Sequence, residues 1–176
     1  SEVFEKMFSE DMDLSEMPEA PMRDHGRAVR LFQGIVDEFP EYGNADGAWY
    51  MLGFIQQRDE TLQADEGRGR DAYLALVDRY PDSEFAAAAH MALGEYFFDN
   101  HRIGSAIENY GKVVDLHAPD GQHYEKGLYK LAWSHYKLSS YETCLDLLAK
   151  LLDWSEENFQ RSGKRSAMAP EAIEYT

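Results

Sequence analysis

A short pattern that returns along the chain limits the folds open to it. Residues 49–53, 90–94 and 128–132 each begin with a large residue, place a leucine three positions later and put a small residue directly after that leucine. Residues three and four positions apart share one face of an α-helix. A pattern of this length that recurs at this spacing is typical of helical hairpins stacked side by side.

Prolines fix the register of these units. Nine positions separate each proline from the pattern that follows it: Pro40 from Trp49, Pro81 from His90, and Pro119 from Leu128. Proline cannot continue a helix from its interior, so each one marks the end of a second helix. The similar segments 36–40 and 77–81 support the same alignment. No stretch alternates apolar and polar residues as a strand does, so the chain is expected to be all-α.

Each unit carries a second helix with its own small and large residues. These are Ala28 and Phe32, Gly69 and Tyr73, Ala106 and Tyr110, and Cys144 and Leu148. Residues 100–104 and 138–140 are expected to form the turns within the last two units. The small residues of the two helices lie 12 positions apart in those units but 16 apart in the second unit, which predicts a four-residue insertion at residues 61–67. The fourth unit has no closing proline.

The two ends of the chain differ from the middle. Residues 1–24 hold eight acidic and two basic side chains among methionines and phenylalanines, and two prolines prevent a regular helix through that stretch. We expect either a degenerate capping helix with a loop, or an acidic, Met-rich arm that docks on a partner or a neighbouring copy. Residues 159–176 are expected to form a basic loop and the start of a further helix, as the fragment of a longer array would.

Residues 27–158 resemble the tetratricopeptide repeat (TPR) family, whose units read W-x2-L-G-x2-Y, then A-x3-F, then P. The third unit matches best, through Leu93, Gly94, Phe97, Ala106 and Tyr110. Segment 80–98 is similar to repeats of bacterial envelope proteins, such as outer-membrane assembly lipoproteins and periplasmic cell-division coordinators. The resemblance implies a right-handed α-solenoid of about four helical hairpins, with residues 25–158 as the repeats. It also implies a location in the periplasm or cell envelope, with the cytoplasm as the alternative.

Charge excludes several classes of partner. The formal net charge is −16, from 33 acidic and 17 basic residues. Nucleic acids and anionic membrane surfaces both attract basic proteins, so neither is an expected partner. No apolar run approaches the ~18 residues of a membrane span, so no membrane insertion is expected. The charge favours a protein or peptide partner that is hydrophobic or basic, or else serves solubility alone.

No arrangement of side chains predicts catalysis. The histidines form no metalloprotease motif, and Cys144 is a single cysteine that is expected to pack in the core. His117 and His123 flank a loop and are expected to be solvated, whereas His90 is expected to pack between helices. No phosphate-binding loop or nucleophile elbow is present in the sequence. We therefore expect no enzyme activity, no cofactor and no metal site.

The first helices of TPR arrays line a concave groove, and the repeat register nominates the side chains that face it. They are Tyr50, Phe54, Gln57, Met91, Glu95, Phe98, Tyr129, Trp133 and Tyr136. Aromatic residues are enriched among them, as in surfaces that anchor a peptide or a helix. The alternative is that several of them pack only against neighbouring repeats. Arg58, Lys126 and Lys137 are the only bases expected nearby, which argues against a clamp for a carboxylate terminus.

Three functional hypotheses follow. The leading one is a non-catalytic scaffold that captures a partner segment in this groove, within a bacterial cell-envelope complex. The second is a structural domain that self-associates, or joins other domains, through its end faces. The third is an accessory domain of an enzyme whose catalytic part lies elsewhere.

Overall fold

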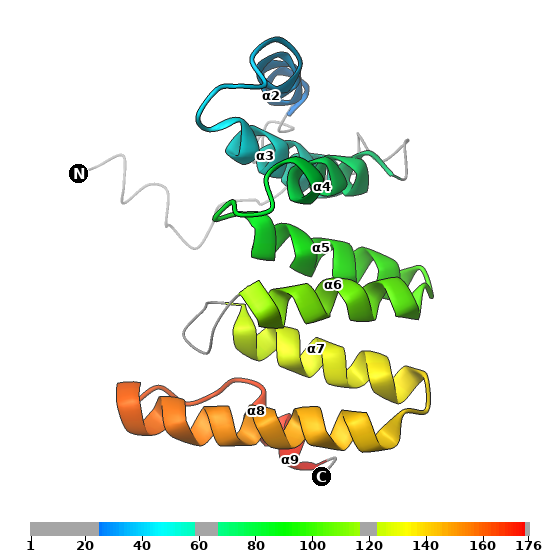
Figure 1. Ribbon diagram of the computed structural model, residues 1–176, viewed down its shortest axis with the longest axis vertical. Coiled ribbons are helices and arrows are strands. Elements are labelled where there is room, and N and C mark those ends of the chain that lie inside the picture. The colour runs from blue at the N-terminus through cyan, green and yellow to red at the C-terminus, as the bar shows by residue number, and fades with distance from the viewer. Residues whose placement is uncertain (1–24, 59–66, 117–122, 175–176) are drawn as a thin grey trace, which may run out of the picture.

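The computed structural model describes residues 25–58, 67–116 and 123–174, and these segments form helices and connecting turns without any strand. The helices are α2 (Gly26–Glu38), α3 (Ala45–Arg58), α4 (Arg68–Arg79), α5 (Ala86–Asp99), α6 (Ile103–Leu116), α7 (Tyr124–Lys137), α8 (Tyr141–Ser162) and α9 (Ala169–Glu174). Figure 1 shows them one below another in chain order, from α2 at the top to α8 and α9 at the bottom. None of these described helices is long and apolar enough to cross a membrane.

Packing in this column joins helices that are neighbours in sequence. The pairs α3–α4, α5–α6 and α7–α8 are complete hairpins, α2 is the second helix of the first unit, and the short α9 packs on α8. Repeat arrays have this one-dimensional organisation because each unit contacts only the units beside it. The expected all-α solenoid is therefore confirmed. The insertion expected at residues 61–67 and the arm expected at residues 1–24 lie largely or wholly outside the described residues.

A glycine in one helix and a tyrosine ring in the next form the seam of two hairpins. A Cβ atom added at Gly53 would lie 2.6 Å from Tyr73 Cε1, and one added at Gly94 would lie 2.5 Å from Tyr110 Cε1. The rings therefore occupy the space that any side chain at these glycines would need. In the third unit the glycine and the tyrosine are 16 positions apart. Their packing explains why the small residue of the pattern occurs together with a large residue in the second helix.

In the fourth unit an alanine and a leucine take the places of the glycine and the tyrosine. Ala132 stands in the glycine position and Leu148 in the tyrosine position, and both lie in one buried cluster. A leucine side chain is narrower than a tyrosine ring, so the extra methyl group of alanine is accommodated. Small and large residues at these two positions are thus matched in volume, as close-packed interiors require.

Tight turns close two of the hairpins at residues with left-handed backbone. His101 between α5 and α6 has φ 60°, and Ser139 between α7 and α8 has φ 59°. The Arg102 N–H donates to the Phe97 carbonyl at 2.8 Å, and the Ser140 N–H donates to the His135 carbonyl at 2.9 Å. Each of these two hydrogen bonds closes a six-residue loop, as in a Schellman motif. This motif ends a helix by satisfying its last carbonyl groups. Both turns expected from the sequence are present.

Helix α8 runs to Ser162, beyond residue 158 where the sequence places the end of the repeats. No proline stops it, and the left-handed Gly163 ends it instead, with φ 70°. The chain then returns to the beginning of α7, because the Met168 N–H donates to Glu125 Oε1 at 2.9 Å. Ala172 of α9 is fully buried in the cluster that contains Leu128 and Leu151.

Candidate partner-binding surface

The first group of predicted contact residues lies on α3. The Tyr50 ring lies 6.3 Å from Phe54, 5.9 Å from Tyr73 and 5.2 Å from Phe85, measured between ring centroids. The Arg58 guanidinium lies 4.2 Å above the Phe54 ring, a cation–π arrangement. Tyr50 and Phe54 are half-buried, so each ring combines a packed side with an accessible one. This end of the surface is aromatic with one cationic edge.

Gln57 is exposed one helical turn further along α3. Its Oε1 atom accepts a hydrogen bond of 3.5 Å from the Tyr73 hydroxyl. Gln57 is therefore accessible, and its role as a contact residue stays a prediction. The Gln57 side chain also stabilises the packing of the hairpin, because it accepts a hydrogen bond from the hydroxyl group of Tyr73, a residue that is only 3% exposed.

The residues predicted on α5 differ in accessibility. Met91 is 5% exposed and belongs to the central core cluster, so its prediction as a contact residue is wrong. The reason is that α5 belongs to the middle hairpin, and helices on both sides close over this position. Phe98 is half-buried against the same cluster. Glu95 is half-buried and pairs with Lys126 Nζ of α7 at 2.6 Å.

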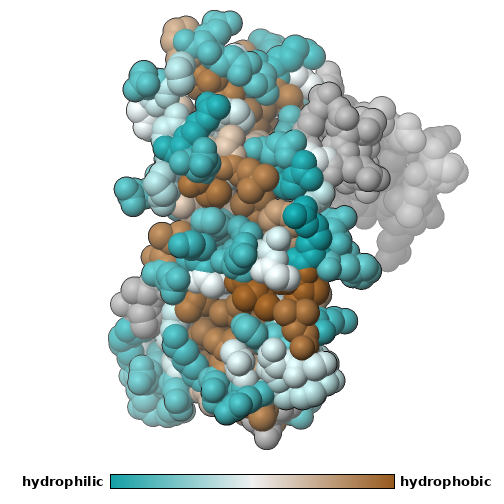
Figure 2. Space-filling view, turned by 45° about the vertical axis from the view of Figure 1, so that its right-hand side comes forward, coloured by the Kyte–Doolittle hydropathy of each residue, from teal (hydrophilic) through white to brown (hydrophobic). Residues whose placement is uncertain are grey.

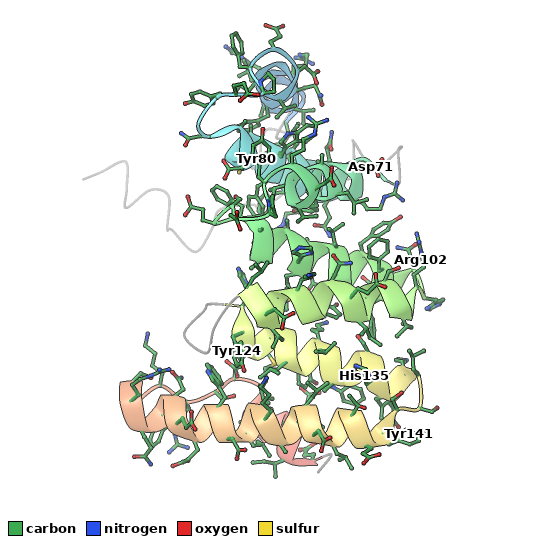
Figure 3. All side chains as sticks on the ribbon, viewed as in Figure 1. Asp71, Tyr80, Arg102, Tyr124, His135 and Tyr141 are labelled. Carbon is green, nitrogen blue, oxygen red and sulfur yellow. The ribbon has the colours of Figure 1, made fainter. Side chains whose placement is uncertain are left out.

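A row of aromatic rings follows α7 and continues onto α8. Tyr129 and Trp133 have centroids 6.1 Å apart, Trp133 and Tyr136 are 5.2 Å apart, and Tyr136 and Tyr141 are 5.5 Å apart. Tyr136 is 47% exposed and Tyr141 is 55% exposed. Edge-to-face ring pairs of this kind hold each other in fixed orientations. Figure 3 places Tyr141 at the same end of the hairpin as His135 of α7.

An apolar cavity of about 130 Å³ opens at the end of this row, and we call it the end pocket. Its lining residues are Trp133, Tyr136, Tyr141, Cys144, Leu145 and Leu148. Tyr141 and Leu145 were not nominated by the sequence, because only first helices were expected to face a partner. Their spacing with Leu148 on one side of α8 is the signal that could have found them.

Three lysines lie beside the aromatic row. Lys126, Lys130 and Lys137 are spaced four and seven positions apart on α7, which places them on one side of the helix. The sequence analysis counted Lys126 and Lys137 but not Lys130. Lys126 is paired with Glu95, so Lys130 and Lys137 carry the positive charge that lies beside the aromatic rings.

Cys144 forms part of the floor of the end pocket. It is 6% exposed and lies in the cluster with Leu148 and Leu151, which confirms its expected packing role. Burial raises the pKa of its thiol, because the thiolate form would lose hydration. Cys144 is therefore a weak nucleophile in the folded protein.

His90 takes the place that Trp49 and Leu128 hold in the neighbouring units. Its Nδ1 lies 2.9 Å from Asn109 Oδ1, and Asn109 Nδ2 donates to the Ser105 carbonyl at 2.8 Å. The amide nitrogen of Asn109 is thus the donor to Ser105, so its Oδ1 atom is the acceptor that faces His90. His90 Nδ1 therefore carries a proton and donates it to Asn109 Oδ1. Burial lowers the pKa of His90. This is the helix-packing role expected from the sequence.

No group of three or more His, Cys, Asp or Glu side chains in the described residues is arranged to hold a metal ion. His123 precedes α7 at its N-cap position, whereas His117 lies outside the described residues. The accessible side chains of α3 and α7 described above are aromatic, with lysines and Arg58 beside them.

The stacked hairpins and their glycine–tyrosine seams define the class of the fold, a TPR-like α-solenoid. The crystal structure of MamA, a TPR-containing protein, is similar to this chain, with a TM-score of 0.60 and 17% sequence identity over 86% of this chain and 84% of that chain. At this identity the likeness shows the fold. No protein-family model and no curated protein matches the sequence.

Proposed function

We propose that this protein is a non-catalytic scaffold that holds a segment of another protein against the aromatic side chains of α3 and α7. The observation that carries the proposal is the ring row from Tyr129 to Tyr141, which leads into the end pocket. Figure 2 shows hydrophobic surface interrupted by hydrophilic surface along the face in view. Exposed aromatic rings that other rings hold in place are suited to anchor a partner, because little side-chain entropy is lost on binding.

Two aromatic areas separated by a charged pair suggest how a partner would lie. Tyr50 and Phe54 form one area and the α7 row forms the other, with the Glu95–Lys126 pair between them. A partner segment with apolar side chains near both ends and polar side chains in its middle would match this order. Arg58, Lys130 and Lys137 would pair with carboxylates of the partner, while the acidic remainder of the chain would attract its basic groups.

A photo-crosslinking experiment tests this proposal. Benzoylphenylalanine placed at Tyr136 is expected to crosslink a discrete partner in the native cell. The same probe at Leu74, which is 39% exposed on α4, provides the control. Crosslinked products that are identical at both sites would contradict capture by the α7 row.

The location of the complex is a separate part of the proposal. The similarity of segment 80–98 to envelope repeats supports a place in a bacterial cell-envelope complex. Fractionation of native cells is expected to recover the protein with the periplasm or the membranes. Recovery in the cytoplasm alone would contradict the envelope location and leave partner capture unaffected.

Self-association is the second candidate function. Exposed apolar side chains occur at both ends of the column, with Leu31 and Phe39 on the α2 side and Tyr141 and Leu145 on the α8 side. Apolar surface at both ends favours contacts between copies.

A further inference from the structure

Helix α2, at one end of the column in Figure 1, carries an apolar face that is covered in the third unit. By repeat register, Ala28, Leu31 and Phe32 of α2 correspond to Ala106, Asn109 and Tyr110 of α6. On α6 these positions face α5, since Tyr110 packs on Gly94 and Asn109 binds His90. On α2, Leu31 is 62% exposed, and its two neighbours on that face are only half-buried. Within the described residues, the face that the first helix of a hairpin covers is thus open on α2.

The sequence before α2 does not carry the pattern of such a first helix. Helices α5 and α7 begin eight residues before their small residue and end five residues after it. The small residue of a first helix precedes that of the second helix by twelve positions, which would place a first helix for α2 at residues 8–21. Glu16 would then stand at the small position and Ser15 at the leucine position. Pro18 would interrupt this helix in its interior. A helix from elsewhere is therefore the better match for the face.

The accessible side of α2 is complementary in charge to a second copy of itself. Arg27, Leu31 and Glu38 are exposed, and their spacing of four and seven residues puts them on one side of the helix. Arg27 lies in the first turn, and Glu38 is the last residue of α2. When two copies of α2 are centred on each other and run antiparallel, Arg27 of each copy comes level with Glu38 of the other. A parallel pair would place like charges together instead.

The other charged residues near this side do not oppose the pairing. Asp37 accepts a hydrogen bond of 3.0 Å from Gln33 Nε2 on the same helix. Arg30 borders a groove that α2 forms with α3 and α4. Glu41 follows α2, so it adds negative charge at the end of the helix that would meet Arg27.

Helix α2 also avoids the repulsion expected between two acidic chains. The formal net charge of −16 opposes the approach of two copies. Helix α2 contains two arginines, one aspartate and one glutamate, so its own formal charge is zero. Leu31 and the half-buried Ile35 lie one turn apart near its middle. In the antiparallel pair, Leu31 of one copy would face Ile35 of the other, so apolar contact forms at the centre and charged pairs form at the edges.

We propose that two copies of this protein pack α2 against α2 in antiparallel orientation about a two-fold axis, with two Arg27–Glu38 pairs at the edges of the contact. Each copy then supplies a helix for the open face of the other, and the contact closes as a dimer. A contact one helix wide is smaller than the roughly 800 Å² per partner of a standard interface, so we expect a weak dimer with a Kd in the micromolar range. This inference rests on the second candidate function, self-association, and leaves the α7 row accessible to a partner.

Sedimentation velocity of the full chain across a wide concentration range tests the dimer. The wild type is expected to shift from monomer to dimer and no further. Arg27→Glu and Glu38→Arg should each weaken dimerisation by roughly tenfold in Kd, because each replaces two attractive pairs by two repulsive ones. An equimolar mixture of the two variants should regain the wild-type affinity, since every charged pair between unlike chains is attractive again.

Further variants separate the contact from general effects of charge. Leu31→Glu should weaken dimerisation at least as strongly, because it places two carboxylates at the centre of the contact. Leu74→Glu on α4, where Leu74 is 39% exposed, is the matched control and should leave dimerisation unchanged. Arg30→Glu changes the charge of α2 equally but should weaken dimerisation much less than Arg27→Glu. Circular dichroism checks that each variant is folded.

Three results would overturn the proposal. The first is a wild type that is monomeric at every concentration, as when the face of α2 is covered within one chain. The second is association that Leu31→Glu does not weaken, which would place self-association on another surface. The third is a mixture of Arg27→Glu and Glu38→Arg that associates no better than either variant alone, which would exclude the antiparallel pairing. Crosslinking of a different protein at Tyr136 is scored independently, so partner capture can hold when the dimer fails.

Discussion

The Tyr110 hydroxyl offers the sharpest test of how the hairpins are packed. The residue is fully buried, and its hydroxyl oxygen has no hydrogen-bond partner within the described residues. Tyr73 is its counterpart in the second unit, and the hydroxyl of Tyr73 donates to Gln57. Gln57 follows Gly53 by four positions, and Phe98 follows Gly94 by the same four positions. A phenylalanine thus stands where the acceptor would be.

The substitution Tyr110→Phe removes the hydroxyl and keeps the ring that fills the Gly94 seam. An unpaired buried hydroxyl costs about 1–3 kcal/mol, so we expect the variant to be more stable by about 1 kcal/mol. For a chain of this length that corresponds to a rise in Tm of roughly 2–4 °C. Tyr73→Phe is the matched control, and it should be neutral or slightly destabilising because it loses a hydrogen bond.

Urea unfolding followed by circular dichroism at several wavelengths measures both variants. The midpoint should rise for Tyr110→Phe without a change in the slope of free energy against urea. Phe98→Gln would supply an acceptor, so in that background the gain from Tyr110→Phe should disappear, which a double-mutant cycle detects. Destabilisation of Tyr110→Phe by 1 kcal/mol or more would refute the reasoning, since it would mean that the hydroxyl is satisfied.

Three further predictions concern the same hairpins. Gly94→Ala should lower the free energy of unfolding by about 1–3 kcal/mol through overpacking. Adding Tyr110→Leu should restore much of this loss, because the pair then matches the alanine and leucine of the fourth unit. Urea unfolding of the single and double variants measures both effects. Burial lowers the pKa of His90, so the unfolded chain binds a proton at a higher pH than the folded protein does. The free energy of unfolding should therefore fall as pH drops below about 6.5. In His90→Leu the part of this fall that is due to His90 should be absent, which unfolding free energies at neutral and mildly acidic pH would show. His101→Gly should stabilise by about 0.5–1 kcal/mol, because glycine adopts the left-handed φ of that turn without strain; a thermal melt that shows no gain would count against it.

The repeat register could be predicted because it depends on local rules. Helix periodicity, the proline stops and the paired small and large residues all lie within one unit. They were enough to place the hairpins α5–α6 and α7–α8 and their turns. The end of α8 was harder to place, because it depends on Gly163 and not on a proline.

The accessibility of the candidate contact residues could be predicted only in part, since it depends on the neighbouring units. Met91 shares a repeat position with Tyr50 and Tyr129, yet it is buried while they are half-buried. The end pocket was missed because it needs Tyr141 and Leu145 from a second helix next to the α7 row. The pattern of α8 alone places Tyr141, Leu145 and Leu148 on one side of that helix, but it does not show that this side meets the α7 row.

The binding affinity of the crosslinked partner segment tests the central claim most directly. Calorimetric titration should be carried out with the wild type and with Phe54→Ala, Trp133→Ala and the control Leu74→Ala. We expect the first two substitutions to weaken binding by roughly tenfold or more each, with thermal unfolding showing that both variants remain folded, and the control to bind like the wild type. Equal affinities for all four proteins would contradict an aromatic contact surface on α3 and α7.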